Sequence, residues 1–77
     1  MWNLKNNQLS KEFNFNSFEE AIKFISALAG ICTKENHHPE IVNKYSKVTV
    51  SFCTHDAGNI VTDLDYKLSK LVDEIVI

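Results

Sequence analysis

Two helix-start signals divide this 77-residue chain and limit the folds that it can adopt. Ser17 is followed three residues later by Glu20, and Thr62 is followed three residues later by Asp65. A hydroxyl side chain paired in this way with an acidic one caps the first turn of a helix. Apolar residues recur at helical spacing after each signal. The sequence therefore predicts one helix from Ser17 to about Thr33 and a second helix that begins at Thr62.

The apolar stripe of each predicted helix defines the face that we expect to be buried. In the first helix the stripe consists of Phe18, Ala21, Ile22, Ile25, Leu28 and Ala29. In the second helix it consists of Leu64, Leu68, Leu71, Val72 and Ile75.

Four segments have the composition or the two-residue alternation of strands, at residues 2–5, 13–16, 41–45 and 48–53. Asn6-Asn7 and Ser46-Lys47 are the expected turns. The order strand, strand, helix, strand, strand, helix favours an α+β fold, with a four-stranded antiparallel sheet and two helices packed on one face. A mass of 8.8 kDa is one domain, residues 1–77. A chain this short buries only about 60% of its unfolded surface, so we expect an oligomer.

Composition excludes several classes of function. Eight basic residues, all of them lysines, against ten acidic residues give a net charge of −2, which argues against nucleic acid as the main partner. No apolar run approaches the about 20 residues of a membrane span. The start of the chain has no secretory signal pattern. Two cysteines are too few for a disulfide framework, so we expect a reducing, cytoplasmic setting.

The three histidines are the candidate functional residues. His37 and His38 precede the third predicted strand, and His55 follows the fourth. The start of one hairpin strand neighbours the end of its partner, so the three rings converge at one end of the sheet. Clustered imidazoles favour acid–base catalysis over zinc binding or a purely structural role. Asp56 either orients an imidazole or bonds its own backbone; Asp65 is more typical of a helix cap, although a cap at a pocket edge can serve both purposes.

The strings His37-His38-Pro39-Glu40, Thr54-His55-Asp56-Ala57-Gly58 and Thr62-Asp63-Leu64-Asp65, together with Tyr45 between the first two, resemble the pterin-4a-carbinolamine dehydratase family. Trp2 and the segment Phe13-Asn14-Phe15-Asn16-Ser17-Phe18 extend the resemblance over nearly the whole chain. The resemblance implies dehydration of 4a-hydroxytetrahydropterin to quinonoid dihydropterin, which recycles the cofactor of aromatic amino acid hydroxylases. It also implies homodimers or homotetramers and no metal or organic cofactor.

The same resemblance implies residue roles. His37 and His55 match the acid–base positions, and His38 matches a position that places the substrate. The positions that line the pterin pocket correspond to Pro39, Thr54, Asp56 and Ala57. Which imidazole is the acid and which is the base stays open.

Three departures from the family pattern affect these expectations. The helix that commonly precedes the first strand is not evident, the loop after His55 is longer by one residue, and Thr33 stands where some members have an acidic group that could pair with the imidazoles. Two alternatives also stay open: a non-enzymatic dimerisation or assembly partner on the same fold, and a small metal-binding module.

Overall fold

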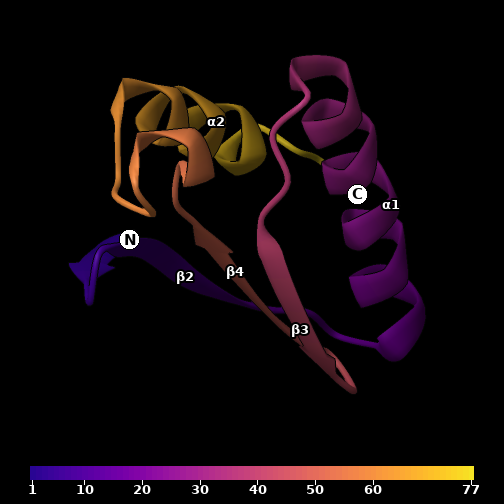
Figure 1. The fold of residues 1–77 in the computed structure, drawn as a ribbon. Coiled ribbons are helices and arrows are strands. Elements are labelled where there is room, and N and C mark those ends of the chain that lie inside the picture. Colours follow the sequence, from indigo (N-terminus) through magenta and orange to yellow (C-terminus); the bar gives the residue numbers. More distant parts are fainter.

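The computed structural model describes all 77 residues as one four-stranded antiparallel sheet and two helices. Along the chain the elements are β1 (Asn3–Lys5), β2 (Gln8–Asn14), α1 (Phe18–Glu35), β3 (Glu40–Lys44), β4 (Lys47–Phe52), the short 3-10 helix η1 (His55–Ala57) and α2 (Asp63–Asp73). The spatial order of the strands is β1-β2-β4-β3 (Figure 1). The predicted α+β class is confirmed. Neither helix has the length and apolar character needed to cross a membrane.

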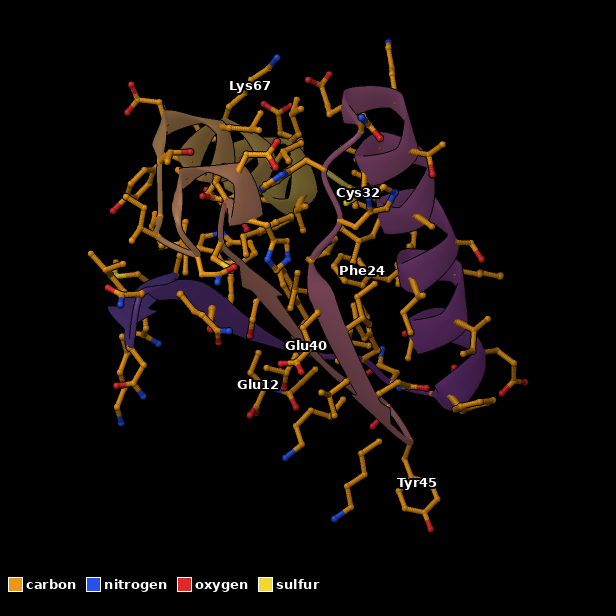
Figure 2. All side chains as sticks on the ribbon, viewed as in Figure 1. Glu12, Phe24, Cys32, Glu40, Tyr45 and Lys67 are labelled. Atoms are coloured by element: carbon orange, nitrogen blue, oxygen red, sulfur yellow. The ribbon has the colours of Figure 1, made fainter.

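Both helices pack on the face of the sheet that carries Val48, Val50 and Phe52 of β4, all of which are fully buried. α1 contributes Phe24, which points toward the sheet in Figure 2, and Leu28. The remaining buried apolar residues of this core are Leu9, Ala21, Cys32, Leu68 and Val72. The yellow C-terminal segment then runs from α2 toward α1 (Figure 1).

The stripe predicted for α1 is partly wrong. Phe18 and Ile22 are 52% and 40% exposed, and Ala29 is also exposed, whereas Phe24 and Cys32 are buried. Apolar residues occupy more than half of the circumference of this helix, so their spacing does not decide which part faces the sheet. α1 consequently presents an uncharged strip, which contains Phe18 and Ile22 one turn apart, to solvent.

The capping predictions for both helices are confirmed. The Ser17 side chain accepts from the backbone N–H of Glu20, and Thr62 and Asp65 form a reciprocal capping box. α1 continues through Gly30 and ends two residues beyond the predicted Thr33, at Glu35.

Strand boundaries differ from the prediction where a polar residue interrupts the pattern. β2 begins at Gln8, well before the predicted residue 13. The prediction misses the first part of the strand because the charged Lys11 occupies a position on the core side and interrupts the apolar alternation. Its ammonium group donates to Asp73 at 2.8 Å and lies 4.9 Å from the centre of the Phe13 ring. The turn between β3 and β4 falls on Tyr45-Ser46, one residue before the predicted one, and Tyr45 projects from its tip (Figure 2).

Candidate active site

The register of β3 and β4 brings the histidine segments together. Glu40 at the start of β3 pairs with Ser51 near the end of β4, so the loops beyond these residues meet at one end of the sheet (Figure 1). A cleft of about 260 Å³ lies there, and its lining residues are Asn36, His37, His38, Thr54, His55, Asp56 and Leu64. The convergence of the three rings predicted from the hairpin is therefore present.

Not every predicted pocket residue lines this cleft. Thr54 and Asp56 do, whereas Pro39 and Ala57 are next to lining residues in sequence but are not among them. Sequence reasoning did not select Asn36 or Leu64. The only sequence signal for Asn36 is its position directly before the histidine pair. In the structure it ends α1 in a left-handed conformation (φ 52°). Leu64 was assigned to the buried stripe of α2.

His37 is held from three directions. Its Nε2 lies 2.6 Å from Oδ1 of Asp65, and its ring stacks parallel to Phe52 with centroids 6.0 Å apart. Its backbone N–H donates to the carbonyl of Cys32 at the end of α1. Only 8% of the residue is exposed, so this imidazole belongs to the edge of the core rather than to a free loop.

Asp65 connects the first turn of α2 to His37. Its Oδ2 accepts from the Thr54 hydroxyl and from the backbone N–H of Thr62, each at 2.8 Å. Burial alone would raise the pKa of this fully buried carboxyl. The hydrogen bonds from Thr62, His37 and Thr54 outweigh burial and lower the pKa below its usual value, so Asp65 is ionised at neutral pH.

Asp65 is a helix cap, as expected, and the same carboxylate also holds a histidine, which is the double role that a cap at a pocket edge can serve. The acidic partner that Thr33 does not provide is supplied instead by Asp65 of α2. Its two oxygens divide the tasks, since Oδ1 contacts His37 and Oδ2 closes the capping box.

His55 is held differently. It is exposed, in the short helix η1, and its Nδ1 lies 2.6 Å from Oδ1 of Asn59. His38 and Asp56 are also exposed on the cleft. The cleft therefore combines one buried imidazole with two accessible ones.

The other reactive groups form no second site. No group of three or more His, Cys, Asp or Glu side chains is arranged to hold a metal ion, which gives the metal-binding alternative no support. Cys32 and Cys53 are both free, and burial raises the pKa of the Cys32 thiol. A buried thiol of this kind packs as a small apolar side chain.

Known proteins with similar sequences share one description. The family model for pterin 4 alpha carbinolamine dehydratase matches residues 1–75. A Sulfurisphaera tokodaii protein provisionally named pterin-4-alpha-carbinolamine dehydratase is 45% identical over 75 residues, which are 97% of this chain and 80% of that protein. A Prochlorococcus marinus (strain MIT 9515) protein with the same provisional name is 47% identical over 74 residues, 96% of this chain and 76% of that protein.

Solved structures agree with the sequence matches. A Brucella melitensis protein described as a transcriptional coactivator/pterin dehydratase superimposes with a TM-score of 0.87 at 32% identity, over 94% of this chain and 78% of that one. A pterin dehydratase-like protein described as a RuBisCO assembly factor of the alpha-carboxysome has the same fold, with a TM-score of 0.75 at 23% identity over 95% of this chain and 83% of that one. With the family model matched along nearly its full length, the chain belongs to the pterin-4a-carbinolamine dehydratase family.

Proposed function

We propose that the protein dehydrates a 4a-hydroxytetrahydropterin to quinonoid dihydropterin, with His37 and His55 as the acid–base pair. The observation that carries the proposal is the shared cleft, in which one imidazole is anchored to an ionised, buried carboxylate and a second is accessible. Membership of the family supports the reaction class, which is that of a hydro-lyase.

The reaction needs two proton transfers, which a pair of imidazoles can supply. The 4a-hydroxyl must gain a proton before it leaves as water, and N5 must lose its proton as the C4a=N5 bond forms. One protonated and one neutral histidine perform both transfers without a metal or organic cofactor.

The remaining polar groups of the cleft would place the pterin ring. His38 and Asp56 offer a ring nitrogen and a carboxylate from opposite loops. The Thr54 hydroxyl is already engaged with Asp65, so we assign Thr54 to shaping the pocket floor. Pro39 and Ala57 enter the proposal from the resemblance alone, as residues that hold the two loops beside the substrate.

A dehydration assay tests the proposal directly. Synthetic 4a-hydroxytetrahydropterin should lose water faster with the wild-type protein than without it, and much more slowly with His55→Ala than with wild type. Equal rates for wild type and the His37→Ala/His55→Ala double variant would remove both residues from the mechanism. Comparing synthetic pterins with different side chains would then identify the preferred substrate.

The second part of the proposal is that the protein self-associates. Self-association is compatible with the enzyme and also with the alternative of a non-enzymatic dimerisation partner. The exposed strip of α1, which contains Phe18 and Ile22, is uncharged and offers an apolar face for a second copy. In an antiparallel pair of α1 helices, Lys34 in the last turn of one copy would lie toward Glu19 in the first turn of the other, while Glu35 beside it is already paired with Lys67.

Light scattering tests this contact. Ile22→Glu should lower the mass in solution, whereas Lys23→Glu, which places the same charge on the neighbouring exposed residue, should not. If both variants keep the wild-type mass, the strip is not the interface. A protein that associates but does not dehydrate the pterin would favour the non-enzymatic alternative.

A further inference from the structure

The loop that carries His55 also supplies the residue that holds its ring. We propose that Asn59 is a positioning residue, which keeps the neutral His55 ring protonated on Nδ1 and so leaves Nε2 as the base of the dehydration. The inference rests on the proposed function and divides the two roles, with His37 as the acid.

The contact itself fixes the position of the proton. Oδ1 of Asn59 lies 2.6 Å from Nδ1 of His55, and an amide oxygen has no proton to give, so the ring nitrogen is the donor. A neutral imidazole carries one proton, and the lone pair is then on Nε2. Since Nδ1 is occupied, Nε2 is the nitrogen of His55 that is left for the substrate.

The backbone of the loop is folded so that Asn59 reaches the ring. Thr54 donates to the carbonyl of Ile60 at 2.8 Å and accepts from the N–H of Asn59 at 3.1 Å, which closes the loop on itself. Gly58 and Asn59 both have left-handed backbones, with φ of 88° and 61°. Asparagine tolerates this conformation better than most residues, so the position suits both its backbone and its amide.

The two histidines differ in the group to which each ring is hydrogen-bonded. The Nε2–H group of His37 donates to the ionised carboxylate of Asp65, and the negative charge of that carboxylate compensates a positive ring. Asn59 offers His55 an uncharged oxygen, which sets the tautomer and adds no such charge. His37 is therefore suited to carry the proton that is donated, and His55 to be neutral when it accepts one.

This division balances the reaction. A proton passes from His37 to the 4a-oxygen, the C4a–O bond breaks, and its electron pair leaves with water. The electron pair of the N5–H bond forms C4a=N5, and the N5 proton passes to Nε2 of His55. Exchange with solvent then reprotonates His37 and deprotonates His55.

The first test measures the tautomer without relying on activity. Two-bond proton–nitrogen correlation spectra of protein with ¹⁵N-labelled histidine distinguish a protonated from an unprotonated ring nitrogen. With the ring neutral, wild-type His55 should be protonated on Nδ1, and Asn59→Gly, which keeps the left-handed backbone, should give a mixture of tautomers. Asn7→Gly is the matched control, because Asn7 has nearly the same φ (60°) in the distant turn between β1 and β2.

The second test measures the rate. Asn59→Gly should lower kcat about two- to tenfold, which is the range for one neutral hydrogen bond, and Asn7→Gly should not change it. Asn59→Asp keeps an oxygen acceptor, so Nδ1 should stay protonated. Its carboxylate also stabilises the charged ring, so the rise of activity with pH that reports the neutral base should move to higher pH than in wild type, while Asp56, His37 and His38 face the same cleft in both proteins.

Two outcomes separate this inference from the proposed function. An unprotonated Nδ1 in the wild-type protein, or equal rates for Asn59→Gly and Asn7→Gly, would overturn the role of Asn59 even if the protein dehydrates pterins. A protonated Nδ1 in a protein with no dehydration activity would overturn the proposed function, and the base role with it.

Discussion

His37 and His55 line the same cleft, but the protein holds them in opposite ways. His37 is buried, stacked on Phe52 and paired with a carboxylate inside the core. His55 is exposed and depends on the side chain of Asn59 in its own surface loop. One side of the site is therefore part of the folded core, and the other side is a surface loop. Activity should depend on both sides, and stability mainly on the first.

The largest expected effect is on activity. His37→Ala and His55→Ala should each lower the rate of pterin dehydration about 10²- to 10⁴-fold, which is the usual contribution of a positioned acid or base. Single-turnover measurement of the product provides the rate. His38→Ala should lower it less, because a residue that only places the substrate can be partly replaced by other contacts. A large loss for only one of the pair would mean that a single histidine performs both transfers.

The second expected effect separates the two sides by stability. His37→Ala leaves the buried charge of Asp65 without its partner, so the free energy of unfolding at pH 7 should fall by about 3–5 kcal/mol. His55→Ala removes an exposed side chain and should change it by no more than about 0.5 kcal/mol. Urea unfolding measures both values.

A second variant checks the cause of that loss. Asp65→Asn in the His37→Ala background removes the unpaired charge, so part of the lost stability should return. Equal midpoints for His37→Ala and His55→Ala would show that the contact between His37 and Asp65 contributes nothing and that the two sides are held alike.

The sequence predicts that the histidines meet, but it does not predict how firmly each one is held. The hairpin register was readable from the alternation at residues 48–53, and with it the convergence of three histidines. Nothing in the loop before Pro39 indicates that His37 is buried. Its burial depends on Phe52, which the hairpin places beside its ring, and on Asp65, which is 28 residues away and which only the packing of α2 brings near. Local sequence patterns do not predict a contact between residues so far apart in the chain.

The local range of sequence patterns also explains where the predicted fold differs from the observed one. The capping signals at Ser17 and Thr62 are local, and both were correct. The buried face of α1 was misjudged because Phe18 and Phe24 are equally apolar, and only the sheet decides between them. The start of β2 is not predicted because a charged residue, Lys11, occupies a core-facing position, where Asp73 neutralises its charge.

The third expected effect is on acid stability. The pKa of Asp65 is lower in the folded protein than the value of about 3.9 for an unfolded chain. The unfolded state therefore binds more protons between these two values, and stability rises with pH there. The contribution of Asp65 is complete above the unfolded pKa and is lost as the pH falls through the folded pKa. Asp65→Asn should reduce the slope of stability against pH below about 4.

Asp63→Asn is the control for this measurement, because Asp63 is an exposed carboxyl in the same turn of α2. Chemical unfolding at a series of pH values gives both slopes. If the slope is the same for wild type and Asp65→Asn, the acid sensitivity of the protein arises elsewhere and His37 is not anchored by a permanent charge.

The smallest expected effect concerns Thr54, the residue at which the two sides meet. Its hydroxyl contacts Asp65, which holds His37, and its backbone closes the loop that presents His55. Thr54→Val keeps the shape and loses the hydroxyl, so the free energy of unfolding should fall by about 1–2 kcal/mol, while Thr54→Ser should lose less. A few-fold drop in kcat that accompanies only the valine variant would show that the carboxylate must be held from both loops. If valine and serine give the same stability and kcat, His37 and Thr62 compensate Asp65 by themselves, and the two sides of the cleft are independent.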